Sequence, residues 1–310
     1  MKILGINISH SFSICIYENK KIIGIYYEDR FVLDKEFDPE KTNFFSSIFD
    51  KIDFNPELVI YSSYGRTFNK VSDKKIIQTI QKQLNNPKFF FDKKNHHIYH
   101  ACSSFYFSNF SEAMAIVIDG GGATSHNIYK EIQSIFYINK KNIFKLSCNL
   151  SCFRFLALPL NFSLKELESI SNIQLIKYDN GVENLYTANP IGGLNFSVAC
   201  NQTNFYKAEG KLMGLSSYAY TNERYHLNYN NVEVAKYVQE KTFKETCILI
   251  EKAYNYKKIK NFVLSGGYFL NCSNNFKYVK KYPEFNFFVD PDPSDGGTAL
   301  GACVFYDNYK

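Results

Sequence analysis

The chain has 310 residues, of which 45% are hydrophobic and 21% are charged, and these values exclude an intrinsically disordered protein. Its length allows two domains of ordinary size or one large domain. Lys and Arg number 36 against 30 Asp and Glu, and the net charge of +6 permits a polyanionic partner without requiring one.

The N-terminal part predicts strands followed by a helix. Apolar, β-branched runs indicate strands at 2–8, 13–18 and 21–27, and the polar turn Glu18-Asn-Lys-Lys21 joins the last two as a hairpin. A further strand is predicted at about 57–62. Apolar residues at helical spacing then predict a helix at about 73–84.

The same pattern begins again near residue 112. The buried strand Ala113-Met-Ala-Ile-Val-Ile118 ends in Asp119-Gly-Gly-Gly122, much as Ile3-Leu-Gly-Ile-Asn-Ile8 ends in Ser-His. Two such openings, each followed by mixed strands and helices, predict a duplicated α/β unit. We therefore expect one domain at residues 1–112 and a second at residues 113–310.

The remainder of the chain predicts alternating helices and strands. The stretch from about 140 to 195 has no sustained period and is expected to mix strand and loop. The other predicted elements are helices at 194–216 and 232–254, a strand at 261–265, a helix at 268–278, a strand at 285–289 and a closing helix from Gly297.

Neither a membrane segment nor a signal peptide is indicated. No apolar run approaches the ~20 residues that a spanning helix needs, and the first nine residues become polar too quickly for a signal peptide. Among the eight scattered cysteines only Cys148 and Cys152 lie close together, which does not suffice for a zinc knuckle. We expect a cytoplasmic protein with reduced, mostly buried cysteines.

Two histidines and two aspartates form a candidate metal site. His96 and His100 are four residues apart, so on a helix both imidazoles share one face and can bind one cation. Asp119 and Asp295, each followed by glycines, can complete the ligand set. Alone, such a histidine pair is more often exposed or hydrogen-bonded than metal-bound. The occurrence of this histidine pair together with the two carboxylates favours the interpretation as a metal site.

Glycine-rich turns after predicted strands indicate a nucleotide cleft. These turns are Gly120-Gly121-Gly122, Gly266-Gly267 and the Gly296-Gly297 pair after Asp295. Each could be a tight loop, because glycine is what a positive φ requires. Strand carboxyl ends are, however, where α/β folds bind ligands, and glycine lets backbone N–H groups approach phosphate oxygens. The nucleotide interpretation is therefore the better one.

Four other residues have two interpretations each. Glu209 and Lys211 flank a glycine and form either a solvated ion pair or part of the nucleotide site. Asn271 is either a helix-face amide without a role or a hydrogen-bond partner of an adenine or ribose. His10 follows the first strand, a position that suits proton transfer or polarisation of a carbonyl.

In this order, the motifs resemble those of the O-carbamoyltransferases of the nodulation-protein and antibiotic-tailoring family. The resemblance spans residues 3–303, except for about 140–195. The matching segments are Gly5-Ile-Asn-Ile-Ser-His10, Glu28-Asp-Arg-Phe31, His96-His-Ile-Tyr-His-Ala-Cys-Ser103, Asp119–Gly122, Glu209–Leu215, Gly266-Gly-Tyr-Phe-Leu-Asn-Cys272 and Asp295–Ala302.

The resemblance implies the actin-like, sugar-kinase-like ATPase fold, with two ribonuclease-H-like domains around a nucleotide cleft, which is shared with the tRNA threonylcarbamoyl transferases. It implies Fe(II) or another divalent metal held by His96, His100, Asp119 and Asp295. The metal would polarise the carbamoyl group of carbamoyl-adenylate, made from carbamoyl phosphate and ATP, for attack by an acceptor hydroxyl. His10 and Lys35 are the candidate catalytic residues. The candidate nucleotide-binding residues are Gly120, Gly121, Gly122, Glu209, Lys211, Gly266, Gly267 and Asn271.

The sequence departs from the family pattern at three places. The family's His-Asp-Ser is His10-Ser-Phe12, and its Lys-His-Asp block is Lys35-Glu-Phe-Asp38. Relatives also have a large C-terminal domain that makes carbamoyl-adenylate, whereas this sequence stops at Lys310. Either a separate carbamoyl-adenylate-forming subunit supplies the intermediate, or this enzyme is one half of a complex, or it uses carbamoyl phosphate differently. The alternative is that this chain is a non-catalytic nucleotide-binding subunit of a larger complex.

The acceptor is least constrained by the sequence. The positive charge and the AT-rich character of the composition suggest a phage-encoded enzyme that acts in a host cell on 5-hydroxymethylcytosine in DNA or on a hydroxymethylpyrimidine nucleotide. A base in a duplex would have to be extruded, and Lys207, Lys211, Tyr206 and Tyr218 are candidates for charge and stacking. A small-molecule or sugar hydroxyl is the alternative. Transfer to tRNA is disfavoured, because the terminal motif and Glu209–Leu215 match the carbamoyl branch.

Overall fold

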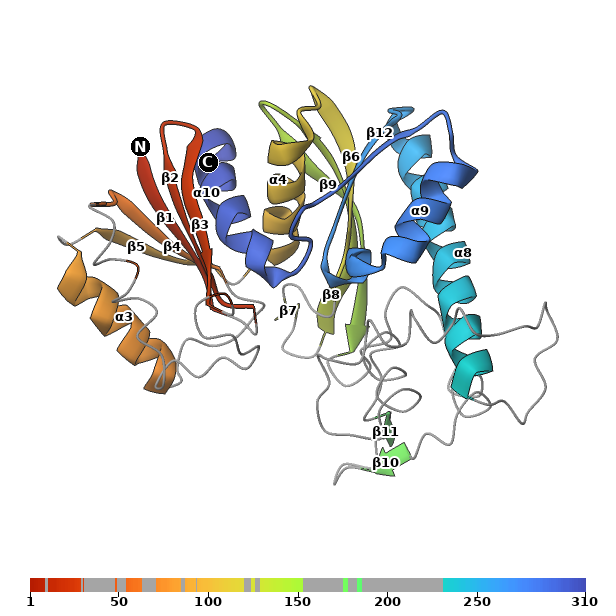
Figure 1. Ribbon diagram of the computed structural model, residues 1–310, viewed down its shortest axis with the longest axis horizontal. Coiled ribbons are helices and arrows are strands. Elements are labelled where there is room, and N and C mark those ends of the chain that lie inside the picture. Colours follow the sequence, from red (N-terminus) through yellow and green to blue (C-terminus); the bar gives the residue numbers. More distant parts are fainter. Residues whose placement is uncertain are drawn as a thin grey trace.

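The computed structural model describes residues 1–8, 11–28, 30, 48, 54–62, 71–84, 87–92, 94–119, 124–125, 129–152, 175–177, 183–185 and 231–310. Within these residues the chain forms two mixed β-sheets with helices between and outside them (Figure 1). A separate antiparallel pair, β10 (Leu175–Lys177) and β11 (Glu183–Leu185), lies outside both sheets.

The first sheet has the strand order β3-β2-β1-β4-β5. Its strands are β1 (Lys2–Asn7), β2 (Ser13–Glu18), β3 (Lys21–Tyr27), β4 (Leu58–Ser62) and β5 (Lys88–Asp92). The first three strands are antiparallel neighbours, whereas β1, β4 and β5 are parallel. The predicted hairpin is confirmed: Asn19 and Lys20 have φ values of 50° and 64°, as a two-residue turn matching the sheet twist requires.

The second sheet repeats this topology with the order β9-β8-β6-β12-β13, and β7 also pairs with β8. Its strands are β6 (Glu112–Ile118), β7 (Thr124–Ser125), β8 (Tyr129–Asn139), β9 (Ile143–Cys152), β12 (Asn261–Ser265) and β13 (Asn286–Val289). Again the first three long strands are antiparallel neighbours, whereas β12 pairs parallel with β6 and β13 pairs parallel with β12. The duplicated ribonuclease-H-like fold predicted from the sequence is confirmed.

The described helices are α3 (Val71–Gln83), α4 (His96–Ser108), α8 (Asn231–Lys257), α9 (Cys272–Lys281) and α10 (Thr298–Tyr309), with short 3-10 helices η4 (Gly267–Leu270) and η5 (Asp295–Gly297). The predicted helix at 268–278 is therefore interrupted. Asn271 breaks it because its side chain caps a new helix by accepting a hydrogen bond from the Asn274 N–H. The helix predicted at 194–216 lies outside the described residues.

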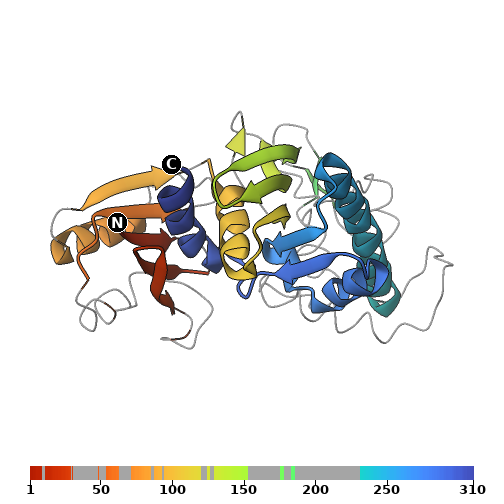
Figure 2. The same cartoon turned by 90° about the horizontal axis from the view of Figure 1, so that it is seen from above.

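Each half of the molecule places its last helix against the sheet of the other half. Helix α4 packs on β6, β8 and β12, whereas α10 packs on β1, β2 and β4, and the two helices contact each other between the sheets (Figures 1 and 2). Glycines allow these close approaches. A Cβ on Gly5 would lie 2.1 Å from the Ala299 carbonyl oxygen, and one on Gly301 would lie 1.8 Å from the Tyr99 carbonyl oxygen.

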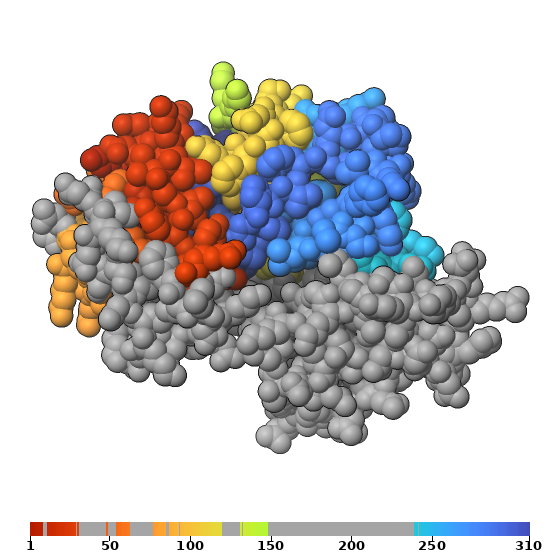
Figure 3. All heavy atoms as spheres, in the orientation of Figure 1, coloured from red at the N-terminus to blue at the C-terminus, as the bar shows by residue number. Residues whose placement is uncertain are grey.

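Because α4 packs on the second sheet and α10 on the first, this exchange of helices bears on the domain boundary expected at residue 112. The second sheet begins there with Glu112, but α10, from the C-terminal end of the sequence, covers the first sheet. Figure 3 shows the same arrangement on the surface, where the yellow segment around residues 100–118 lies between the red N-terminal strands and the blue C-terminal segments. The boundary itself stays a prediction.

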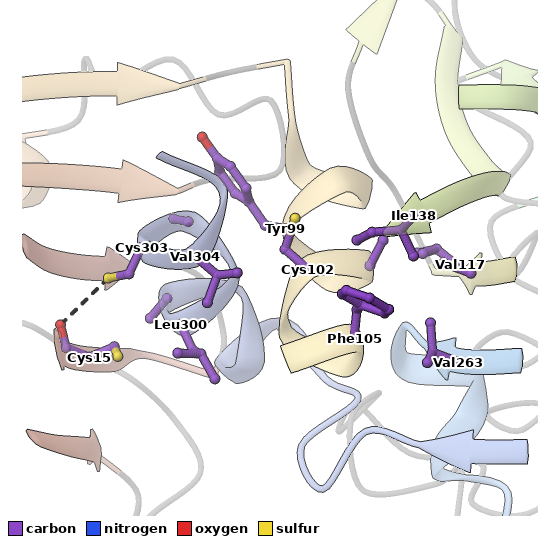
Figure 4. Packing of buried hydrophobic residues seen from close by; sticks show 14 of the residues in the cluster. Cys15, Tyr99, Cys102, Phe105, Val117, Ile138, Val263, Leu300, Cys303 and Val304 are labelled. Atoms are coloured by element: carbon purple, nitrogen blue, oxygen red, sulfur yellow. Dashed lines mark hydrogen bonds between the residues drawn. The ribbon is translucent and has the colours of Figure 1, made fainter. Parts of the chain in front are cut away.

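The central core joins both halves (Figure 4). It contains residues of both sheets, such as Cys15 and Val117, together with Phe105 of α4 and Leu300 of α10. Two other clusters lie on the outer faces: α3 covers the first sheet, and α8 and α9 cover the second. The layers are therefore helix, sheet, paired helices, sheet and helices.

Two further expectations can be compared with the described residues. No helix among them combines the length and apolar character needed to cross a membrane. Of the free cysteines in the described part, Cys15, Cys102, Cys247 and Cys303 are buried and Cys272 is exposed.

Candidate metal centre

The carboxyl ends of three parallel strands form the edge at which the site lies. Strands β6, β12 and β13 are parallel neighbours, so the residues that follow them meet at one sheet edge. Along β6 the side chains of Ala113, Ala115 and Val117 belong to the central core beneath α4. Because successive side chains of an extended segment alternate between faces, Asp119 is the next in that series and faces α4.

Helix α4 brings the two histidines to this edge. Asp92, which ends β5, accepts hydrogen bonds from the backbone N–H groups of Lys94 and Asn95, at 2.8 and 3.2 Å. It also accepts from the Tyr99 hydroxyl. These bonds fix the first turn of α4, so that His96 and His100, one turn apart, point toward the same side.

The four predicted ligands converge. His96 Nε2 lies 3.3 Å from Asp119 Oδ2 and 3.4 Å from Asp295 Oδ1, and His100 Nε2 lies 3.6 Å from Asp295 Oδ1. The two Nε2 atoms are 3.3 Å apart. One ligand atom of each residue lies within 4.8 Å of the others. In a tetrahedral site with bonds of ~2.1 Å, ligand atoms lie about 3.4 Å apart, so the arrangement fits a single cation.

The four side chains are buried and electrostatically coupled. Burial lowers the pKa of His96, but the Asp295 and Asp119 carboxylates outweigh burial and raise this pKa to about 10. Burial and Asp295 raise the pKa of Asp119, but the hydrogen bond with His96 and the charges of His100 and His96 outweigh them and lower it. Without a metal, the positive charge between the carboxylates is therefore a proton on His96. A bound cation would replace it.

Backbone contacts hold the two carboxylates in place. Asp119 Oδ1 accepts a hydrogen bond of 3.2 Å from the Gly267 N–H, which leaves Oδ2 for the centre. Gly266 makes this turn possible: its φ is 98°, and a Cβ there would lie 2.1 Å from the Ile118 carbonyl oxygen. Asp295 starts η5, and its carbonyl oxygen accepts from the Thr298 hydroxyl at 2.6 Å.

The predicted nucleotide and catalytic residues are only partly described. Gly266 and Gly267 lie at the strand edge beside Asp119. Asn271 exchanges two hydrogen bonds with the Gln239 side chain of α8, at 2.8 and 2.9 Å, so a nucleotide contact by its amide would compete with this pair. Outside the described residues lie His10, Lys35, Gly120, Gly121, Gly122, Lys207, Glu209 and Lys211.

Sequence reasoning missed two polar groups beside the centre. Ser265, the last residue of β12, approaches His100 from the sheet and donates a hydrogen bond to Asp290, which follows β13. On the other side of α4, His97 Nδ1 lies 2.8 Å from Ser134 Oγ, and burial together with the charge of His96 lowers the pKa of His97 well below its usual value. The available signal was a polar residue at the end of an apolar strand run, which is where α/β folds place functional groups.

Comparisons with known proteins agree with the fold. No family model matches the chain. An uncharacterized protein of Methanocaldococcus jannaschii is 27% identical over an alignment of 319 residues, which covers 97% of this chain and 56% of that protein. Full-length HypF in its phosphate- and nucleotide-bound form has a TM-score of 0.66 at 16% identity, covering 99% of this chain and 46% of HypF.

HypF from T. kodakarensis is similar to the same extent, with a TM-score of 0.64 at 14% identity over 98% of this chain and 47% of that chain. At such identities the likeness to the two solved structures shows the fold alone. The chain spans about half the length of each of these three proteins.

Proposed function

We propose that this chain is the transfer unit of a metal-dependent O-carbamoyltransferase. In this reaction a carbamoyl group moves from carbamoyl-adenylate, made from carbamoyl phosphate and ATP, to an acceptor hydroxyl. The observation that carries the proposal is the convergence of His96, His100, Asp119 and Asp295 at the carboxyl ends of parallel strands. These residues come from three separate stretches of the fold, namely α4, the end of β6 and η5, and a purely structural subunit has no need to gather them.

The donor set suits Fe(II) or another divalent metal. Two imidazole nitrogens and two carboxylate oxygens bind borderline cations such as iron, cobalt and zinc. When bound, the metal supplies Lewis-acid polarisation of a carbonyl oxygen. The protein holds its ligands in a site largely closed to water, since the side chains of His96 and His100 are 0% exposed and those of Asp295 and Asp119 are 3% and 11% exposed.

Two observations support a nucleotide as the second ligand. The site lies at the sheet edge beside the Gly266-Gly267 turn that follows β12, and such edges bind phosphates in α/β folds. The HypF structure with this fold was obtained with phosphate and nucleotide bound. In the proposed reaction the acceptor oxygen bonds to the carbamoyl carbon, the bond between that carbon and the phosphate oxygen breaks, AMP leaves, and the proton of the acceptor hydroxyl passes to water.

The acceptor proposed first is the hydroxymethyl group of 5-hydroxymethylcytosine, in DNA or as a nucleotide. A sugar or other small-molecule hydroxyl is the alternative. The proposed partner is a separate subunit that forms carbamoyl-adenylate. If the chain instead only binds nucleotide within a complex, it will bind ATP without transferring a carbamoyl group.

The test combines the purified chain, Fe(II), ATP, labelled carbamoyl phosphate and a carbamoyl-adenylate-forming domain with 5-hydroxymethylcytosine DNA, the free nucleoside or a sugar. We expect AMP release and a carbamoyl ester on one acceptor, detected by mass spectrometry, with loss of transfer in His100→Ala. Ser104→Ala is the matched control. It removes a buried hydroxyl of the same helix, but that hydroxyl donates to the backbone carbonyl of Leu264. Nucleotide binding without transfer to any acceptor would leave the non-catalytic subunit as the function.

A further inference from the structure

Ser265 links the candidate metal centre to a carboxylate that is not one of the four ligands. Its Oγ lies 3.4 Å from His100 Nδ1 and donates a hydrogen bond of 3.3 Å to Asp290 Oδ2. All three residues are buried, with exposed fractions of 1% for Ser265, 0% for His100 and 3% for Asp290. A polar chain at this depth requires satisfied partners, so its hydrogen bonds constrain the groups that form it.

Strand alternation explains why these side chains meet α4. Val263 of β12 and Phe288 of β13 contact the central core beneath α4, whereas Leu264 and Val289 face the outer cluster. Two positions beyond Val263 and Phe288, Ser265 and Asp290 face the same side as those residues. They therefore lie beneath His100 as Asp119 lies beneath His96.

The direction of the hydrogen bonds selects one tautomer of the His100 ring, the one with its proton on Nδ1. A serine hydroxyl has one proton, and here it is donated to Asp290. The remaining lone pairs of Oγ accept the proton of His100 Nδ1. The other ring nitrogen, Nε2, then carries a lone pair in place of a proton, and it lies 3.3 Å from His96 Nε2 and 3.6 Å from Asp295 Oδ1. Only a nitrogen without a proton can bind a cation.

The first half of the molecule provides an internal comparison. There the fourth and fifth strands end in Ser62 and Asp92, which are paired in register. In the second half Ser265 ends β12, and Asp290 directly follows β13. Ser62 Oγ instead contacts the Ile6 carbonyl oxygen and, at 3.0 Å, the Thr298 hydroxyl of the exchanged helix α10. The duplicated fold thus presents the same strand-end hydroxyl twice. Among the described residues, only the hydroxyl of the second half meets a histidine.

We propose that Ser265 and Asp290 are positioning residues that hold the His100 ring with Nε2 toward the metal. The inference rests on the metal centre of the proposed function. It adds that the affinity for metal depends on two residues that do not touch the cation. Groups that orient a metal-binding histidine typically change metal affinity 10- to 100-fold when removed.

The test measures Co(II) binding by competition with a chelator for the wild type, Ser265→Ala and Ser104→Ala. Both variants remove one buried hydroxyl beside the end of β12, but the Ser104 hydroxyl donates to the Leu264 carbonyl and not to a histidine. We expect ~10- to 100-fold weaker binding for Ser265→Ala and nearly wild-type binding for Ser104→Ala. Thermal unfolding of the metal-free proteins should show similar, small shifts for both.

Asp290→Asn provides a second variant, because it keeps the size and one acceptor oxygen while removing the charge. We expect a smaller loss of Co(II) affinity in the same direction. Equal binding by Ser265→Ala and Ser104→Ala, with Co(II) binding still abolished by His100→Ala, would overturn the positioning role and leave the metal centre standing. If the wild type binds no more Co(II) than His100→Ala, the metal centre of the proposed function fails instead.

Discussion

Replacing Gly301 by alanine tests whether the crossing of α4 and α10 sets the geometry of the candidate metal centre. The added Cβ would lie 1.8 Å from the Tyr99 carbonyl oxygen, whereas an ordinary contact begins at 3.4 Å. The difference, 3.4 minus 1.8, is about 1.6 Å. Because the obstacle is backbone, no side-chain rotation relieves it, and the helices must move apart.

The same displacement would separate the ligands. His100 follows Tyr99 on α4, and Asp295 lies in η5, which leads directly into α10. A shift of about 1.6 Å is close to half of the 3.6 Å between His100 Nε2 and Asp295 Oδ1. Metal sites tolerate deviations of about 0.2 Å in bond length. Gly301→Ala should therefore weaken Co(II) binding strongly.

The expected loss of stability is also measurable. Overpacking costs about 1–3 kcal/mol, and a contact with backbone belongs at the upper end. Alanine in place of glycine within a helix stabilises it by about 1 kcal/mol, which leaves a net loss of about 2 kcal/mol. Thermal unfolding and Co(II) titration measure the two effects.

Gly24→Ala in β3 is the matched control for Gly301→Ala. There the three atoms nearest to the added Cβ all belong to the side chain of Tyr26, which can turn aside. A Gly301→Ala protein with the stability and Co(II) affinity of Gly24→Ala would refute the reasoning.

Two further predictions concern the ends of the same helices. The Asp295 and Asp119 carboxylates raise the pKa of His96 to about 10, against the effect of burial. The protonated His96 ring should therefore make its full contribution to the stability of the metal-free protein below pH ~6.5. This contribution should be lost as pH rises toward 10. Thermal unfolding across this range should show a slope that His96→Gln lacks. Thr298→Val keeps the side-chain shape but removes the hydroxyl that contacts Ser62 and the Asp295 carbonyl. It should lower the free energy of unfolding by about 1 kcal/mol, measured by urea unfolding. An unchanged urea midpoint would contradict this expectation.

The sequence by itself determined the duplicated fold and the candidate ligands. Apolar runs with alternating faces predicted the strands, and glycine after a strand marked each edge. The i, i+4 spacing of His96 and His100 placed both on one helix face. These features are local, because a hydrophobic period or a turn glycine can be recognised within one short stretch of the sequence. The same locality explains why Asn271 was expected to contact a ligand: its partner Gln239 lies 32 residues earlier.

Only the tertiary structure decided which distant residues meet. The exchange of α4 and α10 between the sheets, which places Asp295 beside His96, depends on close approaches at Gly5 and Gly301 that no sequence period reveals. Likewise, Ser265 becomes a partner of His100 although 165 residues separate them. Such contacts arise because packed helices and paired strands fix side chains to within a fraction of an ångström. That precision comes from the whole core and not from any single segment.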